Sequence, residues 1–138
     1  MCNSISAVCL LFVNGSLTKC KLRGNKLSVE GWTNIFNALR DSPTSMIAEW
    51  DLSNEGIGPT IAKPLAEYLS VTGGLTLIGE GGLDPRYNSL GDEGWGAIIV
   101  AVCSSTVSKI ASIDASRQSI GPAGAKLIAG ALRTSVNG

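Results

Sequence analysis

Histidine is absent from all 138 residues of the sequence. It is the commonest general acid–base group in enzymes, it ligates zinc and iron, and it completes Ser-His-Asp and Cys-His nucleophilic sites. Most familiar hydrolase and metalloenzyme mechanisms are therefore excluded. We predict that the protein is not an enzyme and that it carries no cofactor.

The sequence also lacks an excess of charge of either sign, because 11 basic and 11 acidic residues cancel. The basic residues are spread along the chain, so the electrostatic footprint of a nucleic-acid-binding protein is missing. No apolar run approaches the ~18 residues that a membrane-spanning helix needs. We expect no nucleic-acid partner and no membrane span of the chain's own.

Aromatic residues are few, at 5% of the chain, and cysteines number four. No C-x-x-C pair occurs, and Cys20 falls at a position that we expect to point into the core, where a free thiol behaves as a small hydrophobe. A reducing environment is favoured, so the expected location is intracellular, in the cytosol or an organelle interior. A secreted protein stays possible, because Asn14-Gly15-Ser16 forms a glycosylation sequon.

An irregularly spaced apolar pattern lies between Leu17 and Leu27, with Asn25 near its end and a helix-like segment after it up to Leu39. The spacing fits a short strand that runs into a tight turn. The pattern recurs along the chain, at Ile47, Trp50, Leu52 and Ile57, at Leu83 to Leu90, and at Ile110, Ile113, Ala115 and Ile120. Repetition at a period of roughly thirty residues is typical of a solenoid.

The helical halves of the units align as well, since Gly31-Trp32 matches Gly94-Trp95 and Gly124-Ala125. Two aligned indoles at Trp32 and Trp95 would also suit a ligand cage. A bulky residue wedged between helix and sheet is the simpler interpretation, so we predict that both side chains belong to the core.

On these residues the chain resembles leucine-rich repeat proteins of the long-repeat, ribonuclease-inhibitor-like subclass, whose units read L-x-x-L-x-L-x-x-N-x-L followed by a Gly-containing helix. The resemblance covers about residues 17–133. It implies an α/β fold: a leucine-rich repeat solenoid in a short horseshoe arc, with about four strand-loop-helix repeats, a parallel inner sheet and outer helices. The family is a scaffold for binding unrelated proteins, so it implies no particular partner.

The division of the chain follows from the repeat. Residues 1–16 are predicted to be an N-terminal cap or a partial preceding repeat, and residues 17–138 to be the repeat domain. Its units are expected near 17–46, 47–79 with a Gly-rich insertion, 80–109 and 110–133, followed by a frayed tail.

Local departures from the repeat lead to three further expectations. Glu55 and Gln118 replace the turn asparagine of the other units, which should loosen their turns. Pro64 should kink its helix or delay its start. Asp92 is a plausible N-cap.

The insertion carries five glycines between Gly73 and Gly82. A phosphate-binding loop would end in Lys followed by Ser or Thr, and a dinucleotide-binding loop would open a helix. Neither condition is met, so we interpret the segment as a flexible insertion loop that contacts a partner through Gly79, Glu80 and Gly81. A nucleotide- or metal-binding regulator that uses this loop is the alternative.

Side chains on the inner strands form the expected binding surface of a curved solenoid. The candidate partner-binding residues on this face are Lys19, Lys21, Arg23, Glu49, Asp51, Asp84, Arg86 and Asp114. One end is basic and the rest leans acidic, and such a gradient would orient a partner. An ordinary solvated face explains any single one of these residues equally well.

The function predicted from the sequence is a non-catalytic protein–protein interaction or scaffold module. Because four units bury little core relative to their exposed ends, we expect an accessory or linker subunit within a large multi-subunit complex. The alternatives are the nucleotide- or metal-binding regulator above and a fragment of a secreted recognition receptor.

Overall fold

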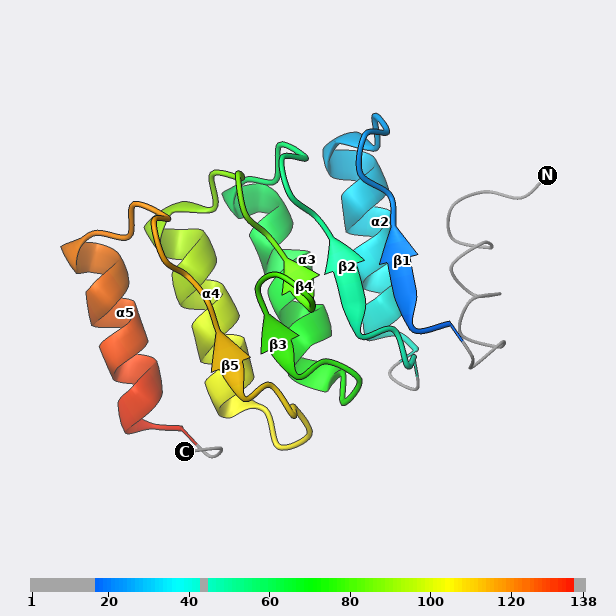
Figure 1. Ribbon diagram of the computed structural model, residues 1–138. Helices are drawn as coiled ribbons and strands as arrows, with labels where there is room; N and C mark the ends of the chain where they lie inside the picture. Colours follow the sequence, from blue (N-terminus) through cyan, green and yellow to red (C-terminus); the bar gives the residue numbers. More distant parts are fainter. Residues whose placement is uncertain (1–16, 43–44, 136–138) are drawn as a thin grey trace.

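The computed structural model describes residues 17–42 and 45–135 (Figure 1). Within these ranges the chain forms nine elements. They are β1 (Lys19–Lys21), α2 (Ser28–Arg40), β2 (Glu49–Asp51), α3 (Pro59–Val71), β3 (Leu77–Ile78), β4 (Leu83–Asp84), α4 (Gly91–Ser104), β5 (Ser112–Ile113) and α5 (Pro122–Arg133). The strands form one parallel sheet in the order β1-β2-β4-β3-β5.

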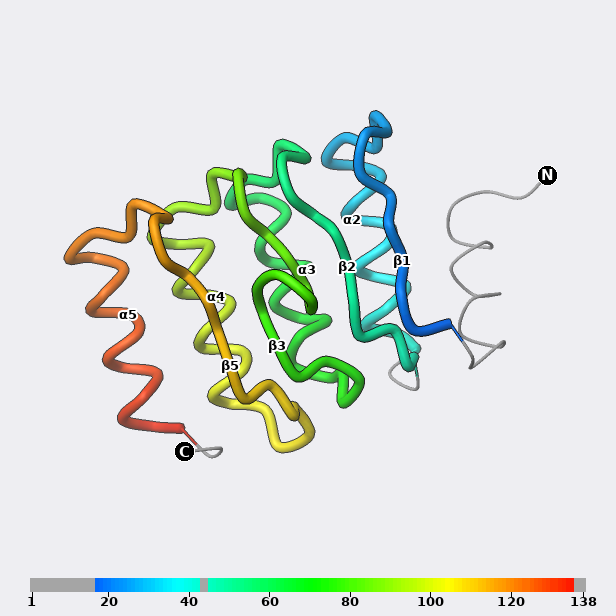
Figure 2. Tube along the Cα trace, in the orientation of Figure 1, coloured from blue at the N-terminus to red at the C-terminus, as the bar shows by residue number. Residues whose placement is uncertain are grey.

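The four helices of the described ranges lie side by side in chain order behind the sheet (Figure 1). Each packs against the next, α2 on α3, α3 on α4 and α4 on α5. The Cα trace passes several times from the sheet through a turn to a helix behind it, and no helix of the described residues lies on the other face of the sheet (Figure 2). The prediction of a mixed α/β fold with a parallel sheet is confirmed.

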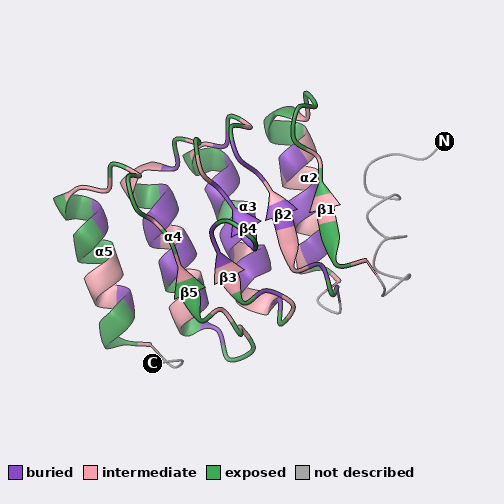
Figure 3. Ribbon diagram, in the orientation of Figure 1, coloured by how far each residue is buried: buried purple, intermediate pink, exposed green. Residues whose placement is uncertain are grey.

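The core lies between the helices and the sheet (Figure 3). Trp32 and Trp95 are 0% exposed and Trp50 is 1% exposed, so the prediction that the aligned indoles belong to the core is confirmed. The Trp32 ring stacks on Phe36 at 5.6 Å between centroids, and Phe36 stacks on Tyr68 at 6.2 Å. Cys20 is a half-buried free thiol packed against this core, and burial raises its pKa.

Two kinds of strand-to-helix turn alternate along the chain. Asn25 and Asn88 each donate from Nδ2 to the carbonyl three residues back, at 2.8 Å and 2.9 Å. The intervening turns lack this asparagine and end instead in Gly58-Pro59 and Gly121-Pro122, where proline takes the first helical position. The offset from Asn25 to Asn88 equals the offset from Gly58 to Gly121, so turns of the same kind recur at the same spacing.

Neighbouring turns are joined by side chains. Asn88 Oδ1 accepts hydrogen bonds from the backbone N–H groups of Glu55 (3.0 Å) and Ile57 (2.9 Å) in the preceding turn. Glu55 Oε2 in turn accepts from the N–H of Gly24 at 3.0 Å. Asn88 Nδ2 also donates to Leu52 O at 2.8 Å, which is the bond that an asparagine at position 55 would have made, so the turn at Glu55 is held by its neighbour, contrary to the expected loosening.

Two helix starts differ from the expectation. The helix α3 begins at Pro59 and continues through Pro64, so the predicted late start is wrong. Pro64 lies close enough to the N-terminus that the amide it lacks removes a single bond near the end of the helix. Asp92 is not an N-cap, because α4 begins at Gly91 after Leu90; its Oδ1 instead accepts from the N–H of Gly121 at 2.8 Å.

The Gly-rich insertion, which we expected to be a loop throughout, contains the two-residue strand β3. β3 pairs with β4 through Ile78↔Leu83 and with β5 through Ile78↔Ile113, so it lies inside the sheet. The chain reaches β4 through a tight loop in which Gly79 and Gly81 have positive φ, at 143° and 91°. A Cβ on Gly82 would stand 2.2 Å from the Leu77 carbonyl oxygen, so the loop needs glycine there as well.

Candidate functional site

The open face of the sheet carries the predicted strand residues. In β1 and β2 the register pairs Lys19 with Glu49 and Lys21 with Asp51, while Cys20 and Trp50 between them point to the core. Successive side chains of a strand point to opposite faces, so these four charged groups share the open face. Asp84 of β4 lies beside Asp51 on the same face.

Opposite charges on this face are already paired within the chain. Lys19 Nζ lies 3.6 Å from Glu49 Oε2, and Arg23 Nη1 lies 4.0 Å from Asp51 Oδ2. The positive charge predicted for one end of this face is thus partly neutralised, because Lys19 and Arg23 each form an ion pair with an acidic residue of β2. Each of these exposed pairs stabilises the fold by at most ~1 kcal/mol.

Arg86 is held more firmly than Lys19 and Arg23, the other paired cations of this face. Its Nε and Nη2 each lie 2.9 Å from one carboxylate oxygen of Asp84, which is a bidentate arrangement, and its Nη1 lies 3.6 Å from Glu80. The hydrogen bonds to Asp84 raise the pKa of Arg86. The guanidinium is therefore a fixed positive group on the surface.

A shallow depression of about 280 Å³ lies on this face. It brings together predicted strand residues and two of the predicted loop residues, Glu80 and Gly81. Its lining consists of Lys21, Arg23, Glu49, Trp50, Asp51, Glu80, Gly81, Gly82, Asp84 and Arg86. Three predicted residues stay outside it: Lys19 at the edge strand, Gly79, which is buried, and Asp114, which follows β5.

Two of the predicted acidic residues, Asp51 and Asp114, have lowered pKa values. A hydrogen bond from the Ser53 hydroxyl, with help from the Ser53 amide, Arg23 and Lys21, lowers the pKa of Asp51. Ser116 lowers the pKa of Asp114 in the same way, through its hydroxyl and amide. Both carboxylates are ionised at neutral pH, so they suit charge recognition better than proton transfer.

Lys21 differs from Lys19 and Arg23, the other predicted cations of this face in the first unit. Its side chain is exposed, and it forms no ion pair within 4.0 Å to any residue that the structure describes. An ammonium group in this state can contact an acidic group of another molecule without first leaving a partner in its own chain.

Two amides of the glycine loop are bonded within the chain and are not free to bind a phosphate. The N–H of Gly79 donates to Leu83 O at 2.8 Å, and that of Gly82 donates to Gly79 O at 3.0 Å. Among residues 17–42 and 45–135, no group of three or more Cys, Asp or Glu residues is placed to hold a metal ion. The same ranges contain no helix long and apolar enough to cross a bilayer.

A second and larger hollow, which sequence reasoning missed, measures about 750 Å³ and lies between the turns that follow β4 and β5. Tyr87 and Arg117 stand at equivalent places on its two sides, each with positive φ, at 62° and 56°. The aligned turns place Gly24 and Asn54 at these positions. The sequence held one sign of this hollow: Tyr87 and Arg117 align with Gly24 and Asn54, at a turn position where bulky residues are uncommon.

No protein-family model and no curated protein matches the chain. Among solved structures, it is similar to the tropomodulin C-terminal domain of Caenorhabditis elegans (TM-score 0.69, 17% identity), covering 96% of this chain and 78% of that one. It is also similar to the leiomodin-1 actin-binding site 2 (TM-score 0.70, 15% identity), covering 95% of this chain and 73% of that one.

These similarities correct one expectation. The resemblance to the ribonuclease-inhibitor-like, long-repeat subclass was wrong, because the similar structures are tropomodulin and leiomodin domains. The spacing of the apolar residues is shared by more than one kind of strand-turn-helix protein, so it could not identify the subclass. At these identities the similarity establishes the fold alone.

Proposed function

We propose that this chain is a non-catalytic protein-interaction module that holds a partner protein against the open face of its sheet. The observation that carries the proposal is the depression, where the strand residues Lys21, Asp51 and Asp84 meet Glu80 and Gly81 of the inserted loop. Charged groups that are fixed by pairing give orientation and specificity to an interface. The exposed Lys21 supplies a group that is ready to pair across it.

The architecture that we propose for this module is a short solenoid of leucine-rich type with four strand-turn-helix units, near 17–46, 47–79, 80–109 and 110–133. It is supported by the helices, which stack in chain order, and by turns that recur at equivalent positions. The role of a scaffold or accessory subunit in a larger assembly, and an intracellular location, belong to the same proposal. The sequon at Asn14 and the segment 1–16 lie outside the described residues.

The partner that we propose to test first is actin. The support is the similarity to the leiomodin-1 actin-binding site 2, which spans nearly the whole of this chain. A depression lined by both charges suits a partner surface that is itself mixed in charge.

The test is co-sedimentation of the chain with actin filaments, together with binding to actin monomers, for the wild type and the variant Lys21→Glu. Reversal at Lys21 should weaken binding about tenfold, because it replaces an attraction across the interface with a repulsion. Reversing Lys19 or Arg23 instead would break an ion pair of the face, with Glu49 or Asp51 respectively, whereas Lys21→Glu breaks none within 4.0 Å among the described residues.

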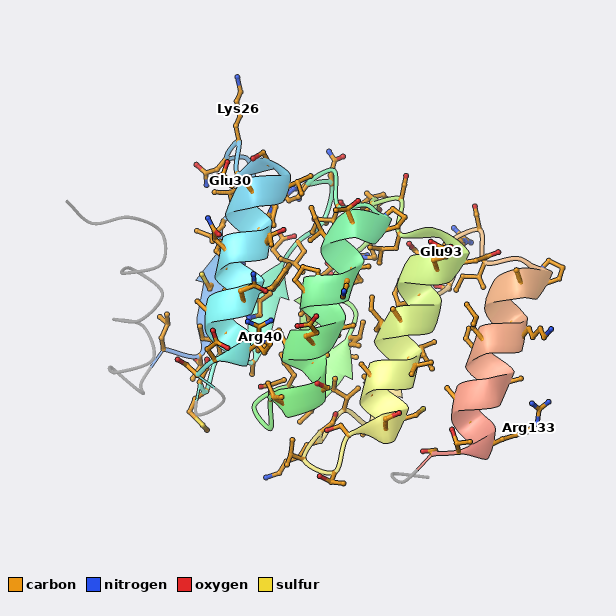
Figure 4. All side chains as sticks on the ribbon, turned by 180° about the vertical axis from the view of Figure 1, so that it is seen from behind. Lys26, Glu30, Arg40, Glu93 and Arg133 are labelled. Atoms are coloured by element: carbon orange, nitrogen blue, oxygen red, sulfur yellow. The ribbon has the colours of Figure 1, made fainter. Side chains whose placement is uncertain are left out.

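Lys26→Glu is the matched control, since Lys26 is an exposed lysine of the same unit that projects from its turn, away from the strand face (Figure 4). It should bind as the wild type does. Absence of binding by the wild type would reject actin, and affinity capture from the native source with the same two variants would then test the face. Equal capture by wild type and Lys21→Glu would reject the strand face as the docking surface.

A further inference from the structure

The junction between the second and third units is tied by one side chain of the third. Asn88 Oδ1 accepts from the N–H groups of Glu55 and Ile57, and its Nδ2 donates to Leu52 O. At the other two junctions of the described chain the position of Asn88 is taken by Glu55 or Gln118, and neither side chain makes this set of bonds. The tie forms only where an Asn turn follows a Gly-Pro turn.

The first and last units are the two halves of such a junction. The last unit has a Gly-Pro turn, in which Ala115 O and the N–H groups of Gln118 and Ile120 form no hydrogen bond to any described residue. The first unit has an Asn turn. Asn25 donates to Leu22 O, and its Oδ1 accepts no hydrogen bond from residues 17–42 and 45–135. Donors are therefore free at one end and an acceptor is free at the other.

The strand charges of the two ends are complementary as well. In the sheet, Asp51 of β2 lies beside Asp84 of β4, which places like charges next to each other. The equivalent of Asp51 in the last unit is Asp114, and the equivalent of Asp84 in the first unit is Lys21. Lys21 forms no ion pair within 4.0 Å among the described residues. The same register between the two ends would therefore place opposite charges side by side.

Other charged groups near this contact change its balance little. The carboxylate of Asp114 accepts hydrogen bonds from an uncharged serine, so it keeps its negative charge. Arg86, whose charge also acts on Asp114, is paired with Asp84. Arg117 would lie near Arg23 of the other end, and Arg23 is already paired within its own chain.

The helices carry matching apolar surfaces. Leu69 of α3 is 0% exposed, whereas its equivalent in α5, Leu132, is 62% exposed. Close packing of α3 on α4 needs a glycine, because a Cβ on Gly94 would stand 3.3 Å from Ala62 Cβ. α2 has Gly31 at this position, so a helix can approach α2 as closely as α3 approaches α4.

We propose that the last unit binds the first unit of a second copy of this chain, in the register of the junction between the second and third units. Asn25 of one copy then bonds to the turn at Gln118 of the other, and Lys21 lies beside Asp114. Each copy has both ends, so the association is head-to-tail and continues past the dimer. The inference goes beyond the proposed function, because it concerns the ends of the chain of units and needs no actin.

The test is sedimentation equilibrium of the full chain without actin, over a series of concentrations. The average mass of the wild type should rise with concentration and pass that of a dimer. Asp114→Lys and Lys21→Glu, each alone, should weaken association about tenfold, because each places like charges side by side. An equimolar mixture of the two variants should associate as the wild type does, since every junction between unlike copies again joins opposite charges.

Leu132→Lys should also weaken association, because it places an ammonium group in the apolar part of the junction. Val100→Lys is its matched control, since Val100 is an apolar residue of α4 that is 40% exposed in an inner unit. It should associate as the wild type does.

A chain that stays monomeric at every concentration would overturn the proposal, and would mean that another segment or another protein covers these ends. A mass that stops at the dimer would overturn it as well. So would a mixture of Asp114→Lys and Lys21→Glu that stays apart while both variants keep the wild-type circular dichroism spectrum, or equal losses with Leu132→Lys and Val100→Lys. A wild type that binds actin as a monomer would leave the proposed function intact, so the two proposals fail separately.

Discussion

At the scale of single residues, the strand-to-helix turns contain backbone conformations that L-amino acids seldom adopt. Gly24, Asn54, Tyr87 and Arg117 occupy one equivalent position, with φ of 88°, 55°, 62° and 56°. Glycine and asparagine tolerate this region, whereas tyrosine and arginine are destabilised there by about 1 kcal/mol or more. The second half of the chain therefore gives up stability at two positions that line the larger hollow, between the turns after β4 and β5.

Arg117→Asn should consequently raise the free energy of unfolding, by about 0.5–1 kcal/mol, because asparagine relieves the backbone strain and Arg117 loses no partner. Urea denaturation followed by circular dichroism measures the change. The reverse substitution at the equivalent turn, Asn54→Arg, should lower stability by a similar amount. A fall in stability with Arg117→Asn would show that the guanidinium stabilises the folded chain after all.

At this scale, the sequence could predict the role of residues that recur at equivalent positions along the chain. Trp32 and Trp95 were identified as core residues because each follows an equivalent glycine, and burial selects for bulk in the same place each time. The pairing of Lys19 with Glu49 could not be predicted, because strand register decides it and three-residue strands leave little trace in the sequence. The bonds from Asn88 to the Glu55 turn were missed for a similar reason, since they join different units.

At the scale of elements, three helix starts, those of α2, α4 and α5, share a packing constraint. Gly31, Gly94 and Gly124 lie at one repeat position, and a Cβ on each would meet Leu27, Leu90 or Ile120 at 3.0, 2.9 and 2.6 Å respectively. Because glycine has no side chain, the first turn of the helix can pack directly on the apolar residue that precedes it. The inserted strand β3 could not be predicted from the sequence, because its two residues, Leu77 and Ile78, are too few to show a periodicity. Their pairing is set by the strands on either side.

Gly94→Ala should lower the free energy of unfolding by about 1–2 kcal/mol, because the added methyl group meets Leu90 Cβ and, at 3.3 Å, Ala62 Cβ. Gly130→Ala is its control in another helix, where nothing lies within 4 Å of the added atom. That change should stabilise the chain by about 0.5–1 kcal/mol through helix propensity. Thermal and urea unfolding of both variants measure the difference, and stabilisation by Gly94→Ala would contradict the packing constraint.

At the scale of the whole molecule, burial falls toward the last unit. Trp50, Ile57 and Leu65 in the second unit are at most 1% exposed. Their equivalents Ile113, Ile120 and Ile128 are only half-buried, and Leu132 is 62% exposed. A unit with a neighbour on one side buries less apolar surface than a unit between two neighbours.

Amide hydrogen exchange should therefore be graded along the chain, with the amides of α3 and α4 more protected than those of α5. A partner that covers the last unit should slow exchange in α5 while leaving α3 unchanged. Mass spectrometry after timed labelling measures both effects. Uniform protection across the helices would mean that the chain unfolds as a single cooperative block and would contradict the gradient.

The alternation of Asn turns with Gly-Pro turns limits how such a chain can lengthen during evolution. Asn88 forms its bonds to the unlike turn behind it, at Glu55 and Ile57. Insertion of a single unit by gene duplication would place two like turns side by side and leave one set of backbone amides without that asparagine. Insertion of two units preserves every junction, so homologous chains of other lengths should differ from this one by an even number of repeats.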